Sequence, residues 1–193
     1  MTQHSRFLLL QGQDKFKTYD NCMIECSKIF TFGRFTLFIY LEMLNTIAGY
    51  DISPTGLDLK NAESSRNGLA FAFGKEELMN HFSGKKLTSA QIKELESDFN
   101  KLIKIINDSN AKHNSIWSIE TTLCAFKKHK LGKRYVGYYI DRQKKELIQM
   151  QQNVTEGVDW DVLWQFREET YDKQFTEADY SWRRTSNRKN DGI

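Results

Sequence analysis

A dense polar segment, Glu63-Ser-Ser-Arg-Asn-Gly-Leu69, holds the side chains best suited to chemistry. In a helix, residues three and four positions apart are neighbours, so Glu63, Arg66 and Asn67 fall on one face. The apolar run that follows favours burial, and buried charges need partners. The spacing therefore predicts that this acid, guanidinium and carboxamide face either other polar side chains or a ligand.

An ordinary helix start explains the same residues differently. Ser64 or Ser65 would cap the first turn, and Glu63 would complement the positive end of the helix dipole. A capping role leaves these side chains solvated, whereas a role in catalysis places them in a pocket. The location of Glu63, Arg66 and Asn67 is therefore the feature that separates the two interpretations.

A second polar segment surrounds a glycine turn with basic side chains and ends in tyrosines. The basic residues are Lys127, Lys128, His129, Lys130, Lys133 and Arg134, and the tyrosines are Tyr135, Tyr138 and Tyr139. Basic loops beside aromatic rings are typical of phosphate contacts combined with base stacking. Cations at a helix C-terminus also complement the helix dipole, so both interpretations stay open.

A third candidate is Arg34, which follows Gly33 and opens an apolar segment that reaches Ala48. An arginine at a helix N-terminus forms an anion site together with the unpaired backbone amides. The alternative is a surface arginine in a loop. Within the apolar segment Glu42 stands out, because a carboxylate in such a helix needs a cation or a hydrogen-bond donor.

Standard catalytic motifs are missing from the sequence. It contains no Walker loop, no GxGxxG, GxSxG or HExxH pattern, and no deaminase pairing of His–Glu with cysteines. The four histidines are scattered, so acid–base chemistry falls to carboxylates. The candidates are Glu42, Glu63, Asp141 and Asp161.

The cysteines Cys22, Cys26 and Cys124 are odd in number, and we expect them to be free thiols. Cys22 and Cys26 lie one helical turn apart, which suits a metal pair. They fit the apolar stripe of a helix better, because cysteine is among the most buried residue types. We therefore expect no metal site and no cofactor.

Helical periodicity runs through most of the 193 residues, and strand-like alternation is scarce. The sequence thus predicts an all-α protein with a single helical domain. Helices are expected over residues 14–31, 34–48, 69–73, 92–106 behind a capping box at Thr88 and Gln91, 115–130 and 136–152, and after Asp159. The segment 34–48, apolar almost all round, is expected to be the central buried helix.

We expect the chain to divide into an N-terminal arm (1–13), a helical catalytic and DNA-binding domain (14–175) and a basic C-terminal tail (176–193). The net charge of +3 is too small to identify a partner. No apolar run is long enough to cross a bilayer, and no signal peptide is recognisable, so we expect an intracellular protein without a membrane partner.

Three segments, in this order, resemble the amino acid:DNA transferases. They are Thr31–Glu42, Glu63–Leu69 and the stretch from Leu123 to Arg142. That family consists of bacteriophage enzymes of thymine hypermodification, related to the alpha-glutamyl/putrescinyl thymine pyrophosphorylases. The resemblance covers most of residues 14–171. It implies the all-helical fold of helix-hairpin-helix DNA glycosylases, and a location in the cytoplasm of the infected bacterial host.

The resemblance also implies a reaction on DNA that carries 5-hydroxymethyluracil. After pyrophosphorylation of the hydroxymethyl group, the transferase replaces the pyrophosphate with the amine of an amino acid or a polyamine. Its partners would be DNA containing this modified thymine and the amine donor. A basic pocket can release the diphosphate, so no metal is required.

On this reading the candidate residues take separate roles. The charge of the pyrophosphate would be stabilised by Arg34, Arg66, Lys127 and Arg134. The proton of the amine would be accepted by Glu63 or, as second choice, by Glu42. Asn67 would bind the uracil edge or the amino acid. The DNA phosphates would be bound by Lys127, Lys128, Lys130, Lys133, Arg134 and Tyr135. The flipped base would stack on Tyr135, Tyr138 or Trp117.

Two other functions remain open. A non-catalytic helical DNA-binding protein would use the same basic loop. A glycosylase-like base-excision enzyme would follow from the implied fold, with Asp141 as its acid.

Overall fold

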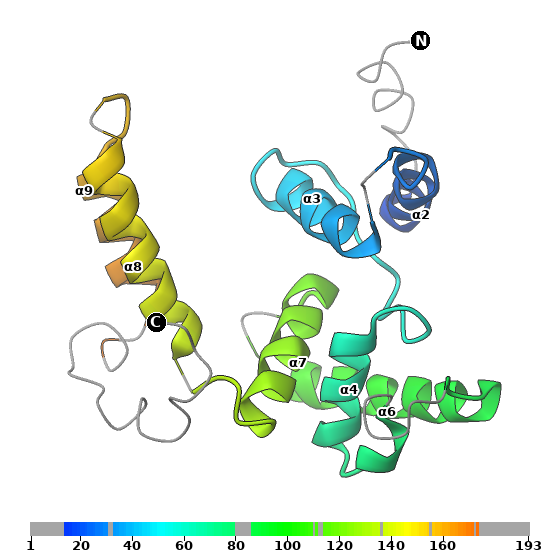
Figure 1. The fold of residues 1–193 in the computed structure, drawn as a ribbon. Coiled ribbons are helices and arrows are strands. Elements are labelled where there is room, and N and C mark those ends of the chain that lie inside the picture. The colour runs from blue at the N-terminus through cyan, green and yellow to red at the C-terminus, as the bar shows by residue number, and fades with distance from the viewer. Residues whose placement is uncertain are drawn as a thin grey trace. The chain divides into compact units, whose positions relative to one another are not determined.

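The computed structural model describes residues 14–30, 33–79, 86–109, 111, 114–135, 137–154, 156–171 and 173. Over these residues the chain is all-helical, with no strand, as the periodicity predicts (Figure 1). The helices are α2 (Lys15–Cys26), α3 (Arg34–Thr46), α4 (Glu63–Ala72), the short 3₁₀ helix η1 (Glu76–Leu78), α6 (Ser89–Asp108), α7 (Ile116–Lys130), α8 (Tyr138–Asn153) and α9 (Trp160–Thr170).

The chain forms two compact units, Met1–Lys127 and Lys128–Ile193, which are called unit 1 and unit 2 below. The expected arm, residues 1–13, and tail, residues 176–193, lie outside the described residues. The division into arm, domain and tail stays a prediction. No helix in the described part of the chain is long and apolar enough to cross a membrane.

One core of unit 1 lies where α2 packs on α3. Asp14 begins α2, because its carboxylate accepts hydrogen bonds from the amides of Phe16 and Lys17. The core contains Tyr19, Cys22, Phe38, Leu41, Ile52 and Trp117. Both Cys22 and Cys26 are buried free thiols, as expected from their place in the apolar stripe.

The prediction that the segment 34–48 forms the central buried helix is wrong. Only Leu37, Phe38 and Leu41 of α3 are buried, whereas Phe35 is 70% exposed and Met43 51% exposed. Helix α3 therefore buries a single face. Its apolar residues lie around the whole helix, and those on the other faces stay exposed.

A second core of unit 1 gathers α4, α6 and α7. The predicted capping box at the start of α6 is confirmed: Thr88 accepts from the Gln91 amide, and the Gln91 side chain accepts from the Thr88 amide. Two turns inside, Leu95 and Phe99 are buried against residues of the other helices. The core consists of Leu59, Leu69, Ala70, Leu78, Met79, Leu95, Phe99, Ile119 and Leu123.

Helix α4 crosses α7 at Gly68 with almost no space between the two backbones. A Cβ atom at Gly68 would lie 2.0 Å from the carbonyl oxygen of Leu123 and 2.6 Å from its carbonyl carbon. Real Cβ atoms do not approach backbone atoms so closely, so only glycine fits here. The glycine of the segment at 63–69 thus has a packing role, which fixes α4 against α7.

Asp98 anchors α6 to the loop after α4. Its side chain is 2% exposed and accepts hydrogen bonds from Lys75 at 2.5 Å and Lys101 at 2.8 Å. Burial raises the pKa of Asp98, but the hydrogen bonds from Lys101 and Lys75 outweigh it and hold the pKa below its ordinary value.

We expect Asp98→Asn to lower the free energy of unfolding by about 1–3 kcal/mol, since it weakens both charge-assisted bonds. The contribution is present above the unfolded-state pKa of about 3.9 and is lost as the pH falls through the lower folded-state pKa. Urea unfolding between pH 7 and pH 2 measures it. The control Glu94→Gln, which removes a half-exposed partner of Lys75 alone, should cost under about 1 kcal/mol.

Unit 2 contains the antiparallel pair α8 and α9 (Figure 1). Gly137 precedes α8 with a φ of +88°, a conformation that suits glycine. The predicted cap at Asp159 is confirmed, because its carboxylate accepts from the amide of Val162. The indole of Trp164 donates to the side chain of Gln151 at 3.1 Å and thereby joins the two helices.

Candidate functional site

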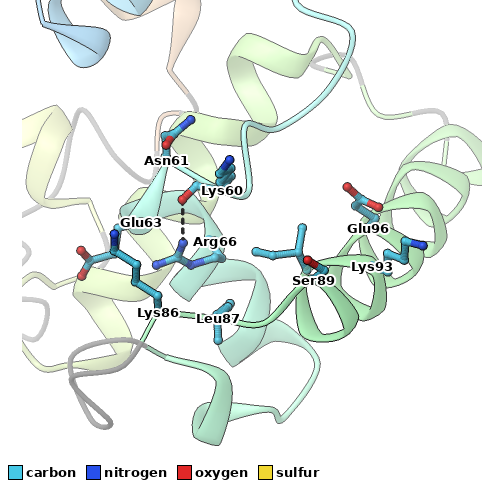
Figure 2. A pocket seen from close by; sticks show the side chains of 10 residues that line it. Lys60, Asn61, Glu63, Arg66, Lys86, Leu87, Ser89, Lys93 and Glu96 are labelled. Atoms are coloured by element: carbon cyan, nitrogen blue, oxygen red, sulfur yellow. Dashed lines mark hydrogen bonds between the residues drawn. The ribbon is translucent and has the colours of Figure 1, made fainter.

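A pocket of about 600 Å³ lies in unit 1 beside the start of α4 (Figure 2). It combines cations and carboxylates from three segments: the turn before α4, α4 itself, and the residues that lead into α6 together with its first turns. Its lining residues are Lys60, Asn61, Glu63, Arg66, Lys86, Leu87, Ser89, Ile92, Lys93 and Glu96. Four cations against two carboxylates make this a net positive hollow that suits a negatively charged ligand.

Arg66 is the buried cation of the pocket, with 3% of its surface exposed. Its Nη1 donates to the carbonyls of Leu59 at 3.0 Å and Lys60 at 3.2 Å, the second of which is drawn in Figure 2. Its Nε and Nη2 are buried without a hydrogen-bond partner among the residues that the structure describes. Burial lowers the pKa of Arg66, and the charges of Glu63 and Asp58 oppose that effect.

Helix α4 begins at Glu63, earlier than the predicted start at Leu69, because a turn before it organises the backbone. The carbonyl of Asp58 accepts from the amide of Ala62, which is the N-cap residue. Neither serine caps the helix: Ser65 is buried, and its hydroxyl donates to the Ala62 carbonyl. The capping alternative is therefore wrong for the serines, whereas Glu63 does lie in the first turn.

Arg34 lies outside this pocket and is held by two carboxylates. Its Nε donates to Asp58 at 2.9 Å, and its Nη1 lies 3.5 Å from Glu120. Burial lowers the pKa of Arg34, but these carboxylates raise it above its ordinary value. The guanidinium also lies 5.8 Å from the ring of Phe38. Arg34 therefore joins α3, the turn before α4, and α7.

Glu120, which the sequence reasoning missed, belongs to the same cluster. It is 5% exposed, and burial raises its pKa against the opposing charge of Arg34. Its Oε2 is buried without a partner in the part of the chain that the structure describes. The signal was available: Glu120 lies between Ile119 and Leu123 on the apolar face of a helix, where a carboxylate needs a partner.

One electrostatic effect and one set of hydrogen bonds relate the Arg34 cluster to its surroundings. Burial raises the pKa of Glu42, and the charge of Glu42 in turn raises the pKa of Glu120. Asp58 accepts hydrogen bonds from both the backbone and the side chain of Asn61, which lines the pocket. Asp58 is therefore shared between the Arg34 cluster and the pocket wall.

Asn67 and Trp117 are buried in unit 1. Asn67 is fully buried within α4. Trp117 is 4% exposed, with its ring 4.6 Å from that of Phe38 and 5.5 Å from that of Tyr19. This location gives Trp117 a packing role in the core, and stacking of a DNA base on it stays a prediction.

The basic and aromatic residues of the second segment form a group within unit 2. The guanidinium of Arg134 lies 4.2 Å from the centre of the Tyr138 ring, which is buried. The hydroxyl of Tyr135 donates to Asp141 at 2.8 Å, and Lys128 donates to the hydroxyl of Tyr139 at 3.0 Å. Lys130 and Lys133 are exposed, and Lys127 is the last residue of unit 1.

The structure thus brings Glu63 and Arg66 together at one pocket, with additional lysines and Glu96 that sequence reasoning did not select. It places Arg34 in a separate cluster of unit 1, and the group from Lys128 to Tyr138 in unit 2. Neither Arg34 nor Asn67 is among the residues that line the pocket. A shared role of the unit 2 group at this pocket stays a prediction. Chemically, the pocket offers buried and exposed cations for an oxyanion, beside a carboxylate that can accept a proton.

Comparison with known proteins adds one match. A family model described as amino acid:DNA transferase matches residues 2–135, which include α2 to α7 and the pocket. No curated protein and no solved structure matches the chain. Because the family model covers more than half of the sequence, the chain belongs to the amino acid:DNA transferase family.

Proposed function

We propose that this protein replaces the pyrophosphate of 5-(pyrophosphoryloxymethyl)uracil in phage DNA with the amine of an amino acid. Family membership makes it a transferase acting on DNA, with an amino acid as the second substrate. The observation that supports the finer proposal is the pocket, which is lined by the buried Arg66, three lysines and the carboxylate of Glu63.

The reaction balances with the groups that the pocket offers. The nitrogen of a neutral amine attacks the exocyclic methylene carbon, a C–N bond forms, and the C–O bond to the pyrophosphate breaks. Both electrons of that bond leave with the pyrophosphate, whose charge Lys60, Lys86 and Lys93 stabilise as it departs. Glu63 accepts the proton that the amine loses, and Glu42 is the second choice for that role.

The remaining candidates keep the roles given above, as part of the proposal. Arg34, Lys127 and Arg134 add positive charge for phosphate groups, and Asn67 binds the uracil edge or the amino acid. The target base is flipped out of the duplex and stacks on Tyr135, Tyr138 or Trp117. We also propose the glycosylase-like helical fold on the resemblance alone, and the domain limits 14–175 on the pattern of the sequence.

Two exposed lysines, Lys130 at the end of α7 and Lys133 in the loop after it, supply a test of DNA binding. The double variant Lys130→Gln/Lys133→Gln should weaken binding to duplex DNA and reduce the slope of log K against log salt by roughly two, because each phosphate contact releases about one counterion. Fluorescence anisotropy from 50 to 200 mM salt measures it. The control Lys144→Gln/Lys145→Gln, on exposed positions of α8, should change the slope little; equal slopes in both variants would reject the loop as a DNA contact.

Nucleoside mass spectrometry tests the reaction itself. The protein is incubated with pyrophosphorylated 5-hydroxymethyluracil DNA and pooled amino acids, and the DNA is then digested. We expect a thymidine derivative whose mass gain equals that of one amino acid, which also identifies the donor. Release of a free base would favour the glycosylase-like alternative with Asp141 as its acid, and binding without any product would favour a non-catalytic DNA-binding protein.

A further inference from the structure

The guanidinium of Arg66 presents one edge that the protein itself leaves unpaired. Its Nη1 is held by the carbonyls of Leu59 and Lys60, which fixes the plane of the group. Its Nε and Nη2 lie along the opposite edge, and both are buried without a partner among the described residues. Buried donors without acceptors are costly, so an edge fixed in this way indicates a site for an external acceptor.

Two parallel N–H groups match the two oxygens of one planar oxyanion. A carboxylate fits this edge bidentately, and a phosphate group does so as well. Transfer of an amino acid onto pyrophosphorylated DNA involves both kinds of oxyanion, so the choice between them has to come from the surroundings of Arg66.

The surroundings favour a carboxylate. Glu63 precedes Arg66 by three residues, so the two side chains are neighbours on α4. A multiply charged pyrophosphate placed on Arg66 would meet the repulsion of Glu63. An amino acid instead carries an amino group beside its single carboxylate, and Glu63 attracts the first while Arg66 binds the second. Lys60, Lys86 and Lys93 line the same pocket and remain for phosphate oxygens.

We propose that the Nε–Nη2 edge of Arg66 binds the α-carboxylate of the amino acid donor and directs its amine toward Glu63. This inference rests on the proposed function, and it makes Arg66 the residue that selects an amino acid over an amine without a carboxylate. Both groups of the donor are thereby recognised by a single turn of α4.

The first test uses the wild-type protein without DNA. Each standard amino acid is titrated and binding is followed by calorimetry. The amino acid that binds is then compared with its α-amide and with the corresponding decarboxylated amine. We expect both analogues to bind at least about tenfold more weakly, because each lacks the anionic pair of oxygens. Equal affinity for the acid and its amide overturns the proposal.

The second test uses Arg66→Lys, which keeps the charge but loses the planar pair of donors. We expect roughly tenfold to hundredfold weaker amino acid binding, with unchanged affinity for inorganic pyrophosphate. Lys86→Met should weaken the binding of inorganic pyrophosphate and leave amino acid binding unchanged. Arg142→Lys, on an exposed arginine of α8, should change neither of these two affinities. Weaker pyrophosphate binding with unchanged amino acid binding in Arg66→Lys assigns the edge to the leaving group and overturns the proposal.

The two proposals fail in different ways. If an amino acid binds in an Arg66-dependent manner but no nucleoside gains mass, the proposed transfer is wrong while the carboxylate site stands. If transfer proceeds equally well with the amino acid and with its decarboxylated amine, the carboxylate site is wrong while the transfer stands. Circular dichroism of Arg66→Lys establishes that it folds; if it does not, the comparison of acid and amide on the wild-type protein decides.

Discussion

Gly68→Ala is expected to abolish the native packing of unit 1. The added methyl group would lie 2.0 Å from the Leu123 carbonyl oxygen, within the backbone of α7, so a side-chain rotation cannot relieve the clash. Helices α4 and α7 would have to separate, which would open the core around Leu69 and Ile119. We expect a loss of at least about 3 kcal/mol, a large part of the total stability of a typical domain.

Urea unfolding followed by circular dichroism measures this effect, and Gly56→Ala is its matched control. A Cβ atom at Gly56 would lie 3.7 Å from the ring of Phe99, an ordinary contact, so that variant should lie within about 1 kcal/mol of wild type. Near-equal stability of the Gly68 and Gly56 variants would show that α4 and α7 are not in direct backbone contact.

Glu63→Gln is expected to reduce the rate of amino acid transfer by roughly 100-fold to 10,000-fold, the range for loss of a general base. Glutamine keeps the size of the side chain but cannot accept the proton that the attacking amine must lose. Glu63 is exposed at the start of α4, so we expect the variant to fold as the wild type does. Single-turnover transfer, followed by nucleoside mass spectrometry, measures the rate.

Glu96→Gln is the control for this prediction, because Glu96 lines the same pocket from α6. We expect its rate to fall less than about tenfold. A wild-type rate in Glu63→Gln would remove Glu63 from the mechanism. The search for the base would then move to Glu42, and to Glu120, whose pKa burial also raises.

Patterns of nearby residues in the sequence predict much of the local helical structure. The capping box at Thr88 and Gln91, the cap at Asp159 and the stripe of Leu95 and Phe99 follow from residues within a few positions of one another, and the structure has them as predicted. The start of α4 was missed because a backbone turn at Asp58 replaces the expected serine cap.

Contacts between distant residues explain what the sequence did not reveal. The carboxylates that bind Arg34 lie 24 and 86 positions away from it, so no spacing rule pairs them. The need for glycine at 68 exists only because α7 crosses α4 there. Arg66 lines the pocket, and the orientation of its Nε and Nη2 depends on two carbonyls of the preceding turn, which no spacing rule reveals.

The double attachment of Asp58 has a consequence for how variants combine. One carboxylate holds both Arg34 and Asn61, so the loss of either partner releases Asp58 to rearrange toward the other. Changes at Arg34 and Asn61 should therefore show non-additive energies in a double-mutant cycle, although the first lies on α3 and the second on the pocket wall. Natural variation at these positions would then be correlated, and a substitution in the Arg34 cluster would alter the affinity of the pocket for its ligand.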